Sequence, residues 1–214
     1  MAHEALPDLN LFMICRTLRR EAPRGMPEPY RLRSMRPDEL GTWKAMPFDD
    51  AATAAAFDGF MEEWAARVYR GREAEFHART LFAVDPDDRP VGTCMLWDAY
   101  GRLPTIHWLK VMPALEGKGI GRALLSAVLR DLDPGAYPVY LHTQPESARA
   151  VALYTDFGFD LLAGERFGTR TNDLEASLPI LRELLPPALF ARLRIAEPPP
   201  EFVAFMATTT AEEF

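Results

Sequence analysis

The sequence predicts a mixed α/β fold, in which helices cover both faces of a mixed β-sheet. Residues 105–157 alternate between strand-like and helix-like segments, a pattern typical of helices packed on a parallel or mixed sheet. Residues 80–84 and 91–97 are strand-like and flank the turn-forming cluster 85–88. This hairpin predicts that part of the sheet is antiparallel.

The first part of the chain is expected to supply an extension, a strand and a long helix. An apolar stretch at 11–18 is followed by closely spaced prolines, so residues 1–29 are expected to form an N-terminal extension outside the core. Residues 30–36 alternate apolar and arginine side chains as a half-buried strand does, and Pro37 then starts a helix. A long helix is expected at 49–70, because apolar side chains recur there at helical spacing. These are Phe57, Phe60, Met61, Trp64 and Val68.

The second part reads as strand, helix, strand, helix and strand. Strands are expected at 105–111 and 139–144, and an amphipathic helix at 120–132. The helix at 147–157 is expected to be capped by Ser147 and ended by Gly158. After the main domain, residues 30–171, the segment 172–214 is expected to form a helical C-terminal appendage. Its apolar side chains predict packing on the core or on a second copy in a homodimer.

Composition excludes several classes of protein. With 214 residues, 48% hydrophobic and 26% charged, the chain resembles an ordinary globular protein. A net charge of −7 without a basic run argues against nucleic acid as a partner. No segment has the length and apolarity of a membrane span or the order of a signal peptide. Cys15 and Cys94 have no metal or disulfide spacing, so reduced cysteines and a cytoplasmic location are expected.

The segment 111–125 carries the strongest functional signal. It joins a strand to a helix through Gly117, Gly119 and Gly121, with Lys118 and Arg122 beside them. Glycines let backbone N–H groups approach phosphate oxygens, and the positive end of the helix dipole faces the same point, so a pyrophosphate is the expected occupant. The spacing fits neither a Walker loop nor a dinucleotide-binding fingerprint. A tight turn that only allows close packing remains the alternative.

Val-x-Pro followed by Gly-Lys-Gly-Ile-Gly-Arg-Ala-Leu-Leu resembles the acetyl-CoA signature of the GNAT superfamily of N-acyltransferases. Residues 148–159 are similar to the next motif of that family, and the resemblance covers residues 30–171 in element order. The chain departs from the family pattern at two positions. Glu116 stands where the family usually has Gln or Arg, and Ser147 where it often has Asn.

The resemblance implies a GNAT-like mixed sheet in which the strands at 105–111 and 139–144 diverge and admit the pantetheine of acetyl-CoA. Backbone groups of 109–111 would pair with pantetheine, and residues 117–122 would hold the pyrophosphate. The implied cofactor-binding residues are Leu109, Lys110, Val111, Gly117, Lys118, Gly119, Ile120, Gly121, Arg122 and Ser147.

Transfer to an amine needs a base, because a protonated alkylamine has no lone pair at neutral pH. His107 and His142 are the candidates, since they lie on the two strands that the resemblance places beside the pantetheine. Each is otherwise a structural histidine of the sheet. Tyr154 occupies the position where many family members carry a tyrosine that protonates the departing thiolate. It also belongs to an apolar helical stripe, so packing is its alternative role.

The function expected from these features is transfer of an acetyl group from acetyl-CoA to an amine on a small molecule or a peptide. A non-catalytic module that binds acyl-CoA is the alternative. No metal is expected, because the acidic cluster 85–88 is typical of a solvated turn. Neither nucleic acid nor a membrane is expected as a partner.

Overall fold

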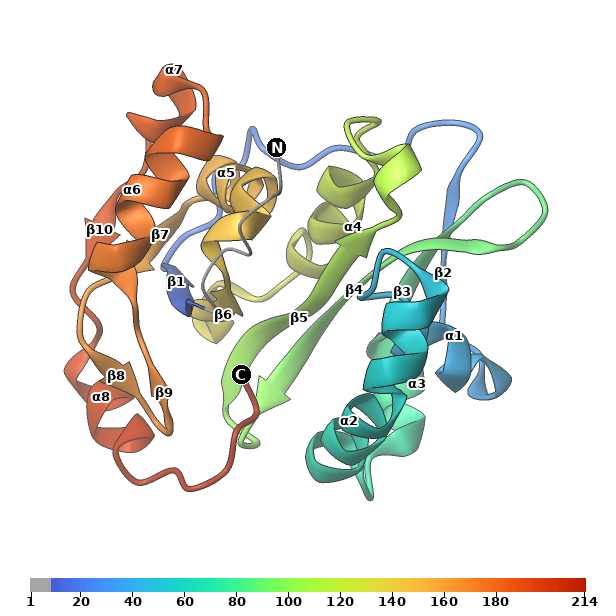
Figure 1. The fold of residues 1–214 in the computed structure, drawn as a ribbon, viewed down its shortest axis with the longest axis horizontal. Coiled ribbons are helices and arrows are strands. Elements are labelled where there is room, and N and C mark those ends of the chain that lie inside the picture. The colour runs from blue at the N-terminus through green and yellow to red at the C-terminus, as the bar shows by residue number, and fades with distance from the viewer. Residues whose placement is uncertain (1–8) are drawn as a thin grey trace. The chain divides into compact units, whose positions relative to one another are not determined.

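A computed structural model describes residues 9–214 as two compact units, residues 21–133 and a unit formed by residues up to 20 together with 134–214. Each unit contains strands and helices, which confirms the predicted α/β class (Figure 1). Residues 1–8 lie outside the described part.

The unit 21–133 contains a sheet in the order β5, β4, β3, β2, and all neighbouring strands are antiparallel. Figure 1 shows β4 and β5 as two long strands side by side. The strands are β2 (Arg31–Ser34), β3 (Leu81–Val84), β4 (Pro90–Ala99) and β5 (Leu103–Val111). The helices are α1 (Leu40–Ala45), α2 (Ala51–Tyr69), α3 (Glu73–Arg79) and α4 (Ile120–Leu129), with short 3-10 turns η1 (Pro37–Glu39) and η2 (Pro113–Leu115).

Alternation along β4 divides the core of this unit between two faces. Met95 and Trp97 point toward α1, α2 and α3 and join an aromatic cluster that includes Trp43 and Trp64. On the other face, α4 packs against β3, β4 and β5. The predicted hairpin and helices are confirmed, but α3 was not predicted, since its single buried residue, Phe76, gives no periodic pattern.

The N-terminal half of α2 extends beyond the core, which corrects one part of the predicted apolar face. Phe57 and Phe60 are 48% and 51% exposed, whereas Met61, Trp64 and Val68 are buried as expected. Helical spacing alone identifies a stripe, but it does not show how far along the helix the sheet reaches.

The second unit contains strands in the order β10, β7, β1, β6. The strands are β1 (Leu11–Cys15), β6 (Val139–Thr143), β7 (Phe159–Leu162) and β10 (Ile195–Ala196), with a separate hairpin of β8 (Arg166–Phe167) and β9 (Arg170–Thr171). The helices are α5 (Ala148–Phe157), α6 (Leu174–Leu184), α7 (Pro187–Phe190) and α8 (Pro200–Met206), with 3-10 turns η3 (Pro134–Ala136) and η4 (Pro145–Ser147).

Strand β1 corrects the expectation that the N-terminal stretch lies outside the core. It runs antiparallel between β6 and β7, with Met13 opposite both Leu141 and Leu161, and all five of its residues are buried (Figure 1). An unbroken apolar run is typical of a strand that is covered on both faces. The apolar run therefore predicts a strand correctly. The prolines that follow it led to the wrong expectation that this strand lies outside the core.

The segment after residue 172 packs on its own unit. Leu174, Leu181 and Leu185 are buried, and the ring of Phe202 stacks on that of Tyr140 with centroids 4.4 Å apart. These apolar side chains of the C-terminal segment therefore pack within their own unit. Homodimer formation stays a prediction.

Gly92 lies where β4, β5 and α4 approach most closely. A Cβ at this position would lie 2.9 Å from the carbonyl oxygen of Lys110 and 3.2 Å from Cδ1 of Leu124. We expect Gly92→Ala to lower the free energy of unfolding by about 1 to 3 kcal/mol, because backbone has to move. Urea unfolding measures the change. Gly25→Ala is the control, since a Cβ there meets nothing within 4 Å, and equal stability of the two variants would contradict the prediction.

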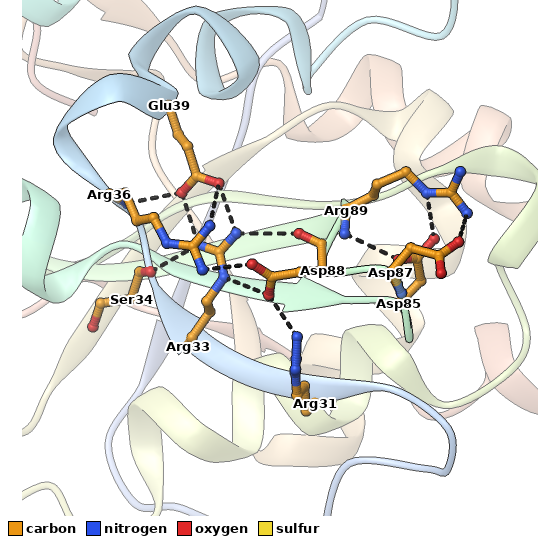
Figure 2. A network of polar contacts seen from close by, with 9 residues as sticks. All are labelled: Arg31, Arg33, Ser34, Arg36, Glu39, Asp85, Asp87, Asp88 and Arg89. Atoms are coloured by element: carbon orange, nitrogen blue, oxygen red, sulfur yellow. Dashed lines mark hydrogen bonds and ion pairs between the residues drawn. The ribbon is translucent and has the colours of Figure 1, made fainter.

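An ion-pair network ties β2 to the turn between β3 and β4 (Figure 2). Arg33 donates to both carboxylate oxygens of Glu39, at 2.7 and 2.6 Å, and to Oδ1 of Asp88 at 3.1 Å. Arg31 and Arg36 also donate to Asp88. The bidentate contact between Arg33 and Glu39 is the strong form of an ion pair between arginine and a carboxylate.

The network predicts acid sensitivity. Hydrogen bonds from Arg36 and Arg33 lower the pKa of Asp88, and one from Arg33 lowers the pKa of Glu39. A carboxylate whose pKa is lower in the folded than in the unfolded state stabilises the protein at pH values above the unfolded pKa, about 4 here. This stability is lost as the pH falls through the folded-state pKa.

We expect Asp88→Asn to unfold more easily than the wild type at pH 7 and to lose less stability on acidification. Asparagine tolerates the left-handed backbone at this position, where φ is 65°. Urea unfolding at pH 7 and pH 3 measures both effects. Asp131→Asn, at an exposed aspartate outside the network, is the control, and parallel pH profiles for wild type and Asp88→Asn would contradict the prediction.

Candidate functional site

The glycine loop depends on backbone conformations that only glycine adopts easily. Gly117 and Gly119 have φ angles of 77° and 86°. A Cβ at either position would meet nothing within 4 Å. The glycines are therefore required for the path of the chain rather than by crowding among the described residues.

Helix α4 begins at Ile120, immediately after this loop. Its buried side chains, among them Leu124 and Leu125, fix the helix against the sheet of its unit. The N-cap residue is Gly119, which has no side chain that could cap the first-turn N–H groups. First-turn N–H groups and the helix dipole are the features with which helix N-termini can hold an anion, and here they lie at the end of the helix next to the loop.

Arg122 and Ser126 connect α4 to the segment before β2. Arg122 Nη1 donates to the carbonyl oxygen of Ala22 at 3.3 Å. Ser126 Oγ accepts from the backbone N–H of Arg24 at 2.9 Å. One donor of Arg122 thus serves a structural contact, while Lys118 is exposed on the loop.

Strand β5 has a bulge at Trp108 and Leu109, where the predicted pantetheine-binding residues begin. Thr93 pairs with Lys110 and Met95 with His107, so two residues of β5 lie opposite one residue of β4. One of the two, Trp108, has a φ of 53°, which is rare for a bulky side chain. Bulges and strained residues of this kind concentrate near functional sites. No pattern in the sequence indicates it.

The predicted residues 109–111 begin within the bulge and are half-buried. Lys110 Nζ lies 2.6 Å from Oδ1 of Asp49, on the surface. The Lys110 side chain is therefore occupied by an ion pair. The groups of this segment that could bind a ligand are therefore its backbone N–H and C=O groups.

His107 is held inside the aromatic cluster. Its side chain is 4% exposed, its Nδ1 lies 3.0 Å from the hydroxyl oxygen of Tyr69, and its ring centroid is 5.5 Å from that of Trp64. Tyr69 was not identified from the sequence. These contacts match the structural role that was the alternative for His107.

His142 is in the other unit, near the end of β6. It is half-buried, its Nε2 lies 2.8 Å from Oδ1 of Asn10, and its ring centroid is 5.1 Å from that of Phe12. Asn10 precedes β1 and was not identified from the sequence. Because β1 pairs directly with β6, residues far apart in the chain meet at this histidine.

Tyr154 and Ser147 belong to the same unit as His142. Tyr154 is 5% exposed, and its ring packs at 5.8 Å from that of Phe159. Ser147 ends the turn η4 in front of α5 and makes no side-chain capping hydrogen bond. The expectation that Ser147 caps α5 is therefore wrong, because its backbone already turns with φ −80° and ψ 34° instead of adopting the extended conformation of a capping residue.

Comparison with known protein families decides the identity of this scaffold. The model of the Acetyltransferase (GNAT) family matches residues 44–159, more than half of the chain. The chain belongs to the GNAT acetyltransferase family. This confirms the resemblance inferred from the glycine loop, and the matched range includes the loop and the two candidate histidines, His107 and His142.

Several curated relatives carry the name mycothiol acetyltransferase. The protein of Propionibacterium freudenreichii is 30% identical over 155 residues, covering 64% of this chain and 45% of the relative. The protein of Kineococcus radiotolerans is 34% identical over 139 residues, covering 59% and 46%. The chain thus spans less than half the length of these relatives. Among solved structures, a GCN5-related N-acetyltransferase from Sphaerobacter thermophilus aligns with 25% identity and a TM-score of 0.45, covering 63% of this chain and 42% of that one.

The predicted site residues of this GNAT protein fall into two groups. The cofactor-binding residues 109–111 and 117–122 lie with His107 in the unit 21–133. His142, Ser147 and Tyr154 lie in the other unit. The predicted divergence of β5 and β6 involves strands of both units and stays a prediction.

The two cysteines of this GNAT chain are unsuited to nucleophilic catalysis. Burial raises the pKa of the Cys15 thiol to about 12 and raises that of Cys94 as well. A nucleophilic cysteine needs a thiolate in an accessible, electropositive place. An acyl-cysteine intermediate is therefore not supported by either residue.

Within residues 9–214, no group of three or more His, Cys, Asp or Glu side chains has the arrangement of a metal site. In the same described range, no helix is long and apolar enough to cross a membrane.

Proposed function

We propose that this chain is an acetyl-CoA-dependent N-acetyltransferase that moves the acetyl group directly to an amine. The observation that carries the proposal is the exposed loop with Gly117 and Gly119 at the N-terminus of α4, in a chain of the GNAT family. The loop combines N–H donors, the helix dipole and the charge of Lys118 at one point. That arrangement suits the pyrophosphate of CoA.

Five further cofactor-binding residues have a proposed part in binding. The backbone of Leu109, Lys110 and Val111 pairs with the amides of pantetheine, as an added strand pairs with a sheet edge. Arg122 adds positive charge next to the pyrophosphate, and Ser147 contributes a hydroxyl group. The acetyl donor itself supplies the activated thioester.

Acetyl transfer needs one proton acceptor and one proton donor. The lone pair of the amine attacks the thioester carbonyl, a C–N bond forms, and the C–S bond breaks. We assign the amine proton to His142 rather than to His107, because His142 is the more exposed of the two and His107 is held in the aromatic cluster by Tyr69. The departing thiolate takes a proton from Tyr154.

The acceptor is an amine of a small molecule or a peptide. Some relatives are named mycothiol acetyltransferase, but the match to this chain covers less than half of their length, so the acceptor here is assigned only as a chemical class.

The expected location is the cytoplasm, because both cysteines are buried and do not form a disulfide with each other. A non-catalytic module that binds acyl-CoA is the alternative function, and Glu116 in the loop is the feature that favours it.

Two measurements test the proposal together. Isothermal titration should show that acetyl-CoA binds, and a thiol-release assay across diverse amines should show turnover with at least one class. His142→Gln should lose the acidic limb of the pH profile of kcat/KM, whereas His107→Gln should lower stability and leave that limb in place. Binding without turnover would favour the module, and an absence of binding would reject both functions.

A further inference from the structure

Three segments of one unit meet at His142 through hydrogen bonds. His142 Nε2 lies 2.8 Å from Asn10 Oδ1, and Asn10 Nδ2 donates to Asp173 Oδ2 at 3.3 Å. The backbone N–H of Asn10 donates to the same carboxylate oxygen at 2.8 Å, and the N–H of Asp173 donates to the carbonyl oxygen of Asn10 at 2.8 Å. Asn10 is therefore fixed by main-chain and side-chain bonds to Asp173.

The neighbours of Asn10 determine which way its amide points. The carboxylate of Asp173 only accepts hydrogen bonds, so the NH₂ group of Asn10 must face it. The oxygen then faces His142, and Arg170 Nη1, which can only donate, lies 3.5 Å from that oxygen. An amide oxygen cannot donate, so the Nε2 of His142 must carry the proton.

We propose that Asn10, held by Asp173, is a positioning residue that fixes His142 as the Nε2–H tautomer. The lone pair that accepts the amine proton is then on Nδ1. The inference rests on the proposed function for the role of Nδ1 as base, whereas the tautomer itself follows from the hydrogen bonds. The ring of Phe12 at 5.1 Å and the amide of Asn10 together hold the imidazole plane in place.

The charges around this chain of hydrogen bonds are largely paired. Arg170 Nη2 lies 2.9 Å from Glu212 Oε2, and the hydroxyl of Thr171 donates to Asp173 Oδ2 at 3.2 Å. When Nδ1 takes up a proton, the polarised amide of Asn10 transmits the negative charge of Asp173 toward the ring. Asn10 thereby favours the protonated ring without contacting the substrate.

Nitrogen NMR of the protein labelled in its histidines tests the tautomer without any need for activity. The signals of His142 are identified by their loss in His142→Gln. In the neutral wild-type ring we expect a protonated Nε2 and an unprotonated Nδ1, and in Asn10→Leu we expect a mixture of tautomers. The same variant should lose roughly 10- to 100-fold in kcat with little change in the KM for acetyl-CoA, because orientation of the base is impaired while cofactor binding is not.

Two further variants complete the test. Thr169→Val, in the turn between β8 and β9, is the control, since Thr169 bonds Glu212 and not Asn10. Asn10→Ala, which also removes the acceptor, replaces Asn10→Leu if the latter does not fold.

Unchanged His142 signals in a folded Asn10 variant would overturn the proposal. A changed tautomer with unchanged kcat would overturn the link to catalysis. If the wild-type protein shows the expected tautomer but transfers no acetyl group, the positioning of His142 by Asn10 stands and the proposed function is rejected.

Discussion

Gly121→Val is expected to abolish measurable binding of acetyl-CoA while the protein stays folded. Gly121 is the second residue of α4, beside the exposed loop, and its backbone does not have the positive φ of Gly117 and Gly119. Valine is therefore compatible with the helix, since its helix propensity is no lower than that of glycine. Its side chain would occupy the space through which phosphate oxygens approach the first-turn N–H groups. Isothermal titration should show an affinity loss of at least about 100-fold.

The chain offers a matched control for this variant. Gly41 is also the second residue of a helix, α1, and a Cβ there meets nothing within 4 Å. Gly41→Val should keep the wild-type affinity. Gly119→Ala is less informative, because the φ of 86° would strain the loop whether or not a ligand binds. Wild-type affinity in a folded Gly121→Val variant would show that the loop is only a tight turn.

Tyr154→Phe is expected to lower kcat by roughly 10- to 1,000-fold with little change in the affinity for acetyl-CoA. Phenylalanine keeps the packing against Phe159 and removes only the hydroxyl group. If the hydroxyl protonates the departing thiolate, the chemical step slows while binding is unaffected. Steady-state kinetics together with titration of acetyl-CoA separates the two effects.

Tyr140→Phe is the control for loss of a tyrosine hydroxyl in the same unit. Tyr140 is buried and stacks on Phe202, and burial raises its pKa to about 12. Its replacement should leave kcat unchanged. A Tyr154→Phe enzyme with full kcat, where chemistry limits turnover, would leave solvent as the proton donor and packing as the role of Tyr154.

The local features of the fold could be predicted because they are determined by residues that are neighbours in the sequence. The glycine loop, the amphipathic α4 and the end of α5 at Gly158 each depend on residues within one or two turns. Gly158, with a φ of 102°, ends its helix as predicted. The same reasoning located the loop and the strand of His107 within the segment that the family model matches.

The non-local features could not be predicted in this way. The apolar run of β1 predicts a strand but not its partners β6 and β7, since pairing is decided by the whole sheet. Asn10 and Asp173 are 163 positions apart, and nothing in their neighbourhoods links them. Trp108 departs from the backbone preference of its residue type because the bulge in β5 imposes its conformation.

The most direct test of the proposed activity follows the acetyl group rather than the thiol. The protein is incubated with acetyl-CoA that carries an isotope-labelled acetyl group and with the amines that promote thiol release, and the products are analysed by mass spectrometry. We expect the label on the nitrogen of the acceptor, in an amount equal to the CoA released, and we expect its loss in Gly121→Val. Release of CoA with the label only in free acetate, or acetyl-CoA binding with no labelled amine in any class, would contradict the assignment as an N-acetyltransferase.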